Sequence, residues 1–345
     1  MRGPLVGVDL ADSGTRLVAT VLEPVLGPVL GPTMAADAVR AARRWYTRLP
    51  EPPSATEAVT HLNVLIARAL AESGMEPGAP GIALGVALAG EVDTRRGVVR
   101  GVRLASGWED FPLARTLGGR WGGPVAVLTT TQAAALGEAR LGAGRGKPDL
   151  VYLLLGRGVS AALIMDGRLA VGAHGRAGDL AHWLALPGGP RCACGAQGHL
   201  DPIASAQSLV RAMIGLAVDQ PESNARMLAV SGGRAEAMTA EQVARLAAEG
   251  DPVARGVVDR ALDALAPALA NLVATLDPDA IVVGGPLAGV RAFLDPLEDR
   301  VAALCQPFTT APPLLGGELE PVAALSGAVA AAAELAGGMR AEVRD

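Results

Sequence analysis

Cysteine and histidine are rare in this chain, and most of them gather in one short stretch. Cys192 and Cys194 are separated by a single residue, and His199 follows five positions after Cys194. His182 precedes Cys192 by ten positions. Two thiolates and two imidazoles make the soft, four-ligand set that suits a tetrahedral zinc ion. The spacing therefore predicts a zinc ion held by His182, Cys192, Cys194 and His199.

The predicted metal is structural rather than catalytic. A site closed by four protein ligands leaves no open position for a reacting water molecule. Glycines at 188, 189, 195 and 198 allow the tight turns that would aim the ligands inward. The alternative is a pair of buried thiols beside histidines on a polar loop. The scarcity of both residue types elsewhere in the chain favours the metal.

Composition and charge narrow the class of protein. The 345 residues include 30 basic and 35 acidic ones, for a formal net charge of −5, and no Lys/Arg block suggests nucleic-acid binding. No apolar run reaches the roughly 18 residues of a membrane span, and the early Asp9 does not fit a signal peptide. Few cysteines, two of them assigned to metal, fit a reducing compartment. We expect a cytoplasmic protein without a membrane partner.

Periodicity predicts alternating strands and helices. Residues 5–10 form a buried strand, and residues 16–22 its hairpin partner. A helix is expected over residues 56–73, with Gly74 as its stop, and strands over 82–88 and 150–155. Thr129 to Thr131 suit the start of another helix, because hydroxyl groups cap free N–H groups there.

The C-terminal third is predicted to contain a long helix. Asp251 and Pro252 suit its cap and first turn, Pro267 is expected to kink it, and it should end before Asp277. A strand over residues 280–283 follows, and Gly284-Gly285-Pro286 is expected to open the next helix.

The stretch around the cysteines resembles the ROK family of repressors and sugar kinases. In that family G-E-x-G-H precedes C-x-C-G-x-x-G-C-x-E, and here the two segments read GDLAH (178–182) and CACGAQGHLD (192–201). The third family cysteine is His199, which can still bind zinc, and both sugar-contacting glutamates are aspartates, Asp179 and Asp201. The resemblance implies that Asp179, His182 and Asp201 contact a sugar or a related ligand.

The resemblance covers nearly the whole chain and implies an α/β fold with two actin-like ATPase (ribonuclease H-like) lobes. Residues 1–120, completed by a C-terminal helix at 321–337, would form the small lobe, and 121–320 the large lobe with a zinc loop at 182–199. Family members commonly dimerise through the large lobe, so a homodimer is expected. Family repressors carry a helix-turn-helix domain ahead of this core. The first strand begins at Leu5, so DNA binding by this chain alone is not expected.

Three glycine-bearing segments resemble the family's nucleotide-binding loops. The implied contacts are Asp9, Gly14 and Thr15 in the first loop, Gly156 and Gly158 in the second, and Gly284 and Gly285 on the adenosine side. The first turn is longer than the family's. In the second loop Arg157 replaces a threonine of the family, and Ser160, Ala161 and Ala162 replace three glycines. Added Cβ atoms keep the backbone away from a phosphate. Binding of MgATP is therefore expected to be weak or absent.

The segment VAVLTTTQAAALGE (125–138) resembles the family's catalytic V-x-x-E-N-D-A-N-A-A-A-L-G-E. In this alignment Thr130 stands at the position of the family's catalytic aspartate, and Thr129 at that of a sugar-binding asparagine. Leu104 stands at the position of another sugar-binding asparagine. A threonine hydroxyl cannot accept a proton near neutral pH as a carboxylate does, so no catalytic residue is assigned.

The sequence predicts a ROK-type pseudokinase. In this interpretation ATP-dependent sugar phosphorylation is lost or strongly reduced, and the protein acts by binding a ligand or by regulation. One alternative is an active ATP-dependent hexose kinase of the glucokinase, fructokinase or N-acetylhexosamine kinase type. Another is an enzyme that acts on a different substrate through a rebuilt site.

Overall fold

The structure is a computed structural model that describes residues 3–10, 16–22, 39, 41–49, 54–76, 81–102 and 105–337. Gly14 and Thr15, to which nucleotide contacts were assigned from the sequence, lie outside these ranges, as does Leu104, which matches a sugar-binding asparagine of the family. Within these ranges, no helix combines the length and the apolar character that a membrane crossing requires.

The described residues divide into two compact units. The first contains the residues up to Leu150, the segment Ala162–Ala177 and the residues from Glu318 onward. The second contains Val151–Ala161 and Gly178–Gly317. The lobe boundaries expected from the sequence stay a prediction.

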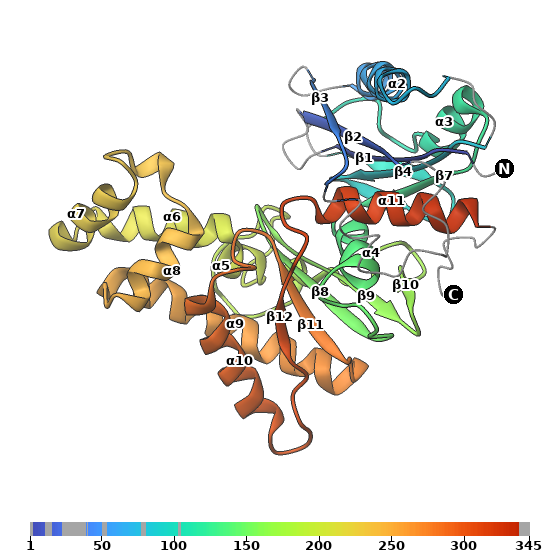
Figure 1. Ribbon diagram of the computed structural model, residues 1–345. Coiled ribbons are helices and arrows are strands. Elements are labelled where there is room, and N and C mark those ends of the chain that lie inside the picture. The colour runs from blue at the N-terminus through green and yellow to red at the C-terminus, as the bar shows by residue number, and fades with distance from the viewer. Residues whose placement is uncertain are drawn as a thin grey trace. The chain divides into compact units, whose positions relative to one another are not determined.

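The first unit is built on a sheet with the strand order β3-β2-β1-β4-β7 (Figure 1). Strand β1 pairs antiparallel with β2 and parallel with β4, which pairs parallel with β7. The strands are β1 (Leu5–Leu10), β2 (Arg16–Leu22), β3 (Arg44–Arg48), β4 (Ala83–Leu88) and β7 (Val125–Thr129). The first two strands are confirmed as predicted, and β4 begins one residue later than expected. A separate hairpin pairs β5 (Glu91–Asp93) with β6 (Val98–Gly101).

Helices α2 (Ala55–Glu72) and α3 (Leu113–Trp121) lie on one side of this sheet (Figure 1). Ser54 caps helix α2: its hydroxyl accepts from the Glu57 backbone N–H, while the Glu57 carboxylate accepts from the Ser54 backbone N–H. Its buried face carries Leu62, Leu65, Ile66 and Leu70, which belong to one core with the strands. The helix predicted for residues 56–73 is therefore confirmed to within one residue at each end.

Helices α11 (Ala323–Ala336) and α4 (Thr130–Leu141) lie on the other side, with α11 between the sheet and α4 (Figure 1). Glycines allow the backbones to approach closely. A Cβ at Gly327 would stand 1.6 Å from the Ala133 carbonyl oxygen, and one at Gly85 would stand 1.8 Å from that of Ala328. Main chain cannot yield as a flexible side chain does, so glycine is required at both positions.

Glu138 joins the end of α4 to the segment that leads into α11. Its buried carboxylate accepts hydrogen bonds from the backbone N–H groups of Ala143 (2.8 Å), Leu319 (2.8 Å) and Glu318 (3.2 Å). Burial raises the pKa of the Glu138 carboxyl above its ordinary value, although the three donors partly offset this effect. Glu138 thus connects segments that are about 180 residues apart in the sequence.

Replacing Glu138 by Gln should destabilise the protein and change how its stability depends on pH. One amide oxygen cannot serve all three donors, and a buried N–H left without an acceptor costs about 1–3 kcal/mol. Because folding raises the pKa, the carboxyl group's contribution is complete below about 4.5 and declines as pH rises through the raised pKa. The free-energy difference between wild type and E138Q should therefore be larger at pH 5 than at pH 8.

Denaturant unfolding of both proteins at the two pH values measures this difference. The exposed Glu109→Gln is the matched control and should keep the wild-type pH dependence. A difference for E138Q that stays constant or grows between pH 5 and pH 8 would contradict the expected direction of the pKa change.

A second sheet has the order β10-β9-β8-β11-β12. Its strands are β8 (Leu150–Leu155), β9 (Val159–Met165), β10 (Arg168–Ala170), β11 (Ala280–Gly284) and β12 (Leu314–Gly316). The helical segments of the second unit are η1 (Leu180–His182), α5 (Asp201–Ala204), α6 (Ala206–Ala217), α7 (Pro221–Val230), η2 (Ala235–Ala237), α8 (Ala240–Ala248), α9 (Pro252–Leu276) and α10 (Arg291–Cys305). The strand predicted at 150–155 is confirmed, and that at 280–283 extends through Gly284.

The long helix predicted in the C-terminal third is confirmed as α9. The Asp251 side chain caps it by accepting from the Ala254 N–H, and Pro267 lies within it without ending it. The prediction for the next helix is wrong, because α10 begins at Arg291 rather than at Gly284. Gly285 has a φ of +85° and begins a turn, so the chain cannot enter a right-handed helix directly after β11.

Candidate functional site

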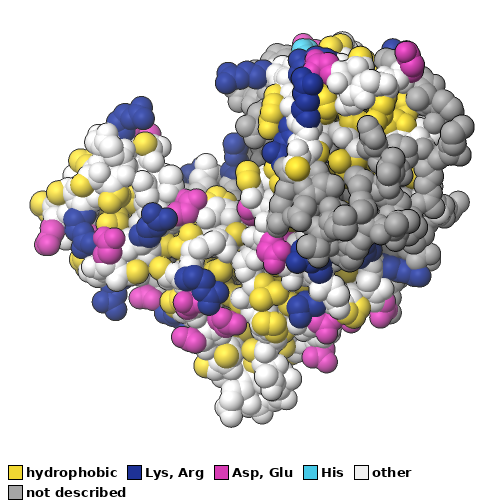
Figure 2. All heavy atoms as spheres, in the orientation of Figure 1, with side chains coloured by type: hydrophobic (Ala, Val, Ile, Leu, Met, Phe, Trp, Pro, Cys, Tyr) yellow, Lys and Arg dark blue, Asp and Glu magenta, His cyan; other side chains and the backbone are white. Residues whose placement is uncertain are grey.

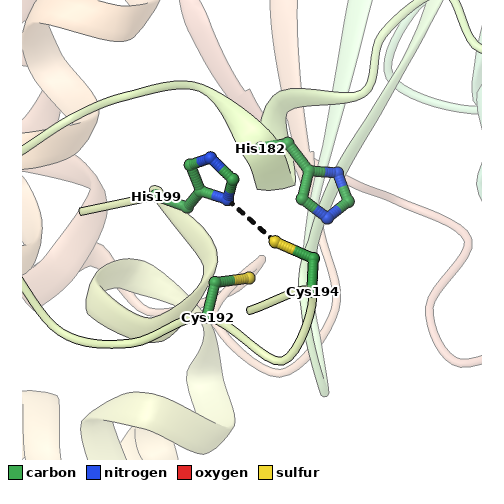
Figure 3. Close-up of side chains that lie close together, drawn as sticks. All are labelled: His182, Cys192, Cys194 and His199. Atoms are coloured by element: carbon green, nitrogen blue, oxygen red, sulfur yellow. Dashed lines mark hydrogen bonds between the residues drawn. The ribbon is translucent and has the colours of Figure 1, made fainter. Parts of the chain in front are cut away.

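The four predicted metal ligands come together in the second unit. One ligand atom each from His182, Cys192, Cys194 and His199 lies within 4.8 Å of the others (Figure 3). The Cys194 sulfur lies 3.3 Å from Nδ1 of His199, and the two imidazole rings are 5.3 Å apart between centroids. Two sulfur and two nitrogen donors at this separation form a group that can hold a metal ion.

A tight turn positions the two cysteines. The Cys192 N–H donates to Ala196 O and the Gly195 N–H to Cys192 O, at 2.8 and 2.9 Å. Gly198 then brings the chain back against Leu186, with a φ of +80° and no room for a Cβ, which would stand 1.9 Å from the Leu186 carbonyl oxygen. A bridge between Leu184 and His199 places the two histidine-bearing segments side by side. The structure therefore shows why glycine is needed at position 198 of this loop, as the sequence predicted.

The two thiols differ in environment. All three cysteines lie among the described residues and are free, with Cys192 and Cys305 buried and Cys194 exposed. Burial raises the pKa of the Cys192 thiol above its ordinary value of 9.0. Without a metal this group is therefore a protonated thiol at neutral pH, and metal binding has to release its proton.

Asp179 lies beside this group. Both oxygens of its carboxylate are 2.9 Å from Nδ1 of His182. The residue occupies the N-cap position of η1 but makes no side-chain capping bond to that segment's described backbone. The sugar contact expected for Asp179 stays a prediction.

The predicted second nucleotide loop is hydrogen-bonded to the side chain of Asp201. The Asp201 Oδ1 accepts a hydrogen bond of 2.8 Å from the Val159 N–H, and a Cβ at Gly158 would stand 2.7 Å from the same oxygen. The Gly156 N–H donates to Gly158 O at 3.0 Å and closes the turn. Glycine at 158 therefore makes room for the carboxylate, a reason that the sequence alone did not reveal.

The predicted adenosine-side glycines lie near the same end of β8. A Cβ at Gly285 would stand 2.6 Å from the Leu155 carbonyl oxygen, and one at Gly284 would collide with the Tyr152 hydroxyl at 1.9 Å. The structure thus brings two segments together that are about 130 residues apart in the sequence. Gly285 faces backbone and has a φ of +85°, so it requires glycine, whereas a larger residue at 284 would have to displace the Tyr152 side chain.

The predicted helix start at Thr129 is confirmed. Thr129 is the N-cap of α4, its hydroxyl accepts from the Gln132 N–H, and the Gln132 side-chain oxygen accepts from the Thr129 N–H, both at 3.1 Å. The same oxygen accepts from the Thr94 hydroxyl at 2.9 Å. The Thr130 hydroxyl oxygen is buried and has no hydrogen-bond partner among the described residues. Helix α4 is described throughout, and its first turn contains no acidic residue.

Asp9 lines a pocket of about 360 Å³ that belongs wholly to the first unit. Asp9, Val18 and Tyr46 form a row across β1, β2 and β3, because Asp9 pairs with Val18 and Val18 with Tyr46. The remaining lining residues are Arg44, Glu318, Leu319, Glu320, Pro321, Val322 and Leu325. These remaining residues were not expected from the sequence, since only the strand register and the return of the chain before α11 bring them together.

Charge on the drawn face of the second unit is mixed. Figure 2 shows acidic and basic side chains interspersed over helices α6 to α10. This face therefore carries no basic patch of the kind that binds a nucleic-acid backbone.

Comparisons with known proteins agree with these motifs. The sequence profile of the ROK family matches residues 40–334. The glucokinase of Thermotoga maritima is 31% identical over 225 residues, which are 65% of this chain and 70% of that protein. The Streptomyces coelicolor glucokinase is 30% identical over 261 residues, 75% of this chain and 79% of that protein.

A solved structure extends the likeness to the fold. The crystal structure of a ROK family glucokinase from Streptomyces griseus, in complex with glucose and AMPPNP, superposes with a TM-score of 0.75. The sequence identity is 28%, and the match covers 95% of this chain and 98% of that one.

Proposed function

This chain belongs to the ROK family and has the actin-like ATPase fold of its sugar kinases, and from this premise we propose that its own ATP-dependent sugar phosphorylation is lost or strongly reduced. In this proposal the protein is a pseudokinase that binds a ligand or regulates a partner. The observation that carries it is the start of α4, where Thr130 stands at the position that the family's register gives to the catalytic aspartate.

The chemistry supports this assignment. Transfer of a phosphoryl group to a sugar hydroxyl needs a group that takes the hydroxyl proton, and a positioned base contributes about 10²–10⁴-fold. Thr130 has no basic atom for that role at neutral pH. The Thr129 hydroxyl and the Gln132 amide are both engaged in the cap of the helix. Positioning of the reactants alone would leave a trace of activity at most.

A second candidate is an active hexose kinase of the glucokinase, fructokinase or N-acetylhexosamine kinase type. Two relatives that are 31% and 30% identical are glucokinases. Glycine is also kept at 156, 158, 284 and 285, and the last three positions have the close approaches described above. In that case a group other than residue 130 would accept the proton.

The site residues follow from the family register. We propose that a sugar or related ligand contacts Thr129, Asp179, His182 and Asp201. Any nucleotide would contact Asp9, Gly14, Thr15, Gly156, Gly158, Gly284 and Gly285, with weak MgATP binding because of the altered phosphate loops. We further propose a cytoplasmic homodimer that does not bind nucleic acid by this chain alone.

The metal in this proposal is zinc with a structural role. The donor set of His182, Cys192, Cys194 and His199 fits the tetrahedral coordination that zinc prefers, and Cys192 is buried as in a closed site. A bound ion would fix the loop between η1 and α5, and with it the two aspartates at its ends.

The proposed loss of activity is tested by measuring ADP release. Purified wild-type protein is incubated with MgATP and each of a panel of hexoses and amino-hexoses, with an active ROK glucokinase as the positive control. We expect no sugar-dependent ADP above background. Turnover that depends on one sugar would overturn the pseudokinase and restore the hexose kinase. Calorimetric titration with MgATP should show no micromolar binding, and such binding would contradict the proposal for the phosphate loops.

A further inference from the structure

The side chain of Asp179 has an unusual partner for its position. Aspartate at a helix N-cap commonly accepts a hydrogen bond from the first-turn N–H groups. Asp179 holds the N-cap position of η1, yet its carboxylate instead faces the His182 ring, with both oxygens 2.9 Å from Nδ1. The carboxylate is therefore directed at a residue of the metal group rather than at the backbone.

The local backbone produces this pairing. Asp179 is the N-cap of η1 and His182 is its last residue, three positions later, so one short turn of chain brings the two side chains together. Gly178 precedes them with a φ of +88°, and its carbonyl accepts from the Ala161 N–H at 2.9 Å and the Leu180 N–H at 2.7 Å. The start of η1 is thus anchored to β9, which limits how far Asp179 can move.

The pairing decides which nitrogen of His182 is available to a metal. A carboxylate has only acceptor atoms, so Nδ1 must carry the proton and donate it to Asp179. In the neutral ring Nε2 then has the lone pair, which is the form of imidazole that binds metal ions. His199 differs, because its Nδ1 is the atom that lies 3.3 Å from the Cys194 sulfur.

We propose that Asp179 is a positioning residue of the metal site, which fixes the tautomer and the orientation of His182 so that Nε2 is presented to the ion. Carboxylates that accept from the second nitrogen of a ligating histidine raise its basicity, and their loss typically weakens metal binding by about 10–100-fold. The inference rests on the proposed metal site and is independent of kinase activity.

The effect belongs to the metal-bound protein. The His182 and Asp179 side chains are 46% and 39% exposed, and an exposed pair of this kind contributes little to folding by itself. With a cation held at Nε2, the Nδ1–H of His182 would be a stronger donor to the Asp179 carboxylate, because the ion would withdraw electron density from the ring. Removing Asp179 should therefore weaken zinc binding while changing the stability of the metal-free protein much less.

The test measures zinc affinity in competition with a chromophoric chelator. Full-length protein is stripped of metal and titrated with Zn²⁺ as wild type, Asp179→Ala, Asp179→Asn and Asp179→Glu. We expect a loss of about 10–100-fold for the alanine variant. The loss should be smaller for asparagine, which keeps one acceptor oxygen, and glutamate should recover part of the affinity because it restores the carboxylate. Asp219→Ala, an exposed aspartate of the same unit, is the matched control and should bind like wild type.

Two further readouts separate positioning from a merely structural role. Nitrogen-15 NMR of the zinc-loaded wild type should show His182 with a protonated Nδ1 and a metal-bound Nε2. Relative to wild type in the same metal state, the Asp179→Ala variant should lose more melting temperature when zinc is bound than when the metal is absent.

The proposal is overturned by any of four results. In the affinity titration, these are an Asp179→Ala variant that binds zinc as tightly as wild type, or an Asp179→Glu variant that binds it no more tightly than Asp179→Ala. In the other two measurements, they are an NMR spectrum with zinc on Nδ1 of His182, or equal losses of melting temperature with and without metal. Zinc binding by the wild type is measured before any variant is compared. A wild type that binds no zinc would refute the metal site itself rather than the role of Asp179.

Discussion

Thr130→Asp should raise sugar-dependent ADP release by about 10²–10⁴-fold over wild type, because it restores a carboxylate that can accept the proton of the attacking hydroxyl. Residue 130 is the first residue of α4 and stands directly after the N-cap Thr129. An acidic side chain is favourable at a helix N-terminus, so the variant should fold. The measurement is the coupled assay of ADP release with MgATP and the hexose panel, with the melting temperature as a check on folding.

The matched control is Thr130→Asn, which has nearly the shape of aspartate but cannot accept the proton. It should stay as inactive as wild type. If Thr130→Asp also stays silent while it folds normally, the loss extends beyond the base, and the proposal that residue 130 limits the reaction is wrong. If Thr130→Asn gains as much activity as Thr130→Asp, the gain comes from shape rather than from proton transfer.

Replacing Cys194 by Ser should reduce the bound zinc from one ion per chain to near none and lower the melting temperature. A hydroxyl is a much weaker ligand than a thiolate, and structural zinc sites contribute their binding energy to folding. Cys192→Ser should have the same effect, with an added cost because its side chain is buried. Elemental analysis of protein purified without chelator and thermal unfolding with and without EDTA measure both consequences.

Cys305→Ala is the control for the general effect of losing a thiol. Cys305 is fully buried and lies at the end of α10, outside the metal group, so its loss should leave the zinc content unchanged. Wild-type protein with clearly less than one zinc per chain would contradict the prediction. So would a Cys194→Ser variant that retains its full zinc content.

Features that depend on nearby residues were predictable from the sequence. The cap of α4 uses hydrogen bonds between Thr129 and Gln132, and that of α9 uses Asp251 and Ala254, all within three residues. The metal group joins residues that lie within one segment of 18 positions, from 182 to 199. Short-range spacing and side-chain chemistry are properties of the sequence itself, and they are enough to identify such features.

The tertiary structure decided which partner each polar side chain has when that partner is distant. Glu138 binds backbone near residues 318–319, and Asp201 binds the Val159 N–H from 42 positions away. The Asp9 pocket depends on the register of three strands, and the need for glycine at 285 depends on the nearby Leu155 carbonyl, which an added Cβ would strike. A buried donor or acceptor has to find a partner, but sheet order and helix packing determine which one comes within reach. The sequence therefore determined the family and the grouping of His182, Cys192, Cys194 and His199, because both depend on motifs of short range. The fold alone decided which partners the aspartates and glycines around that group contact, because those partners are distant in the sequence.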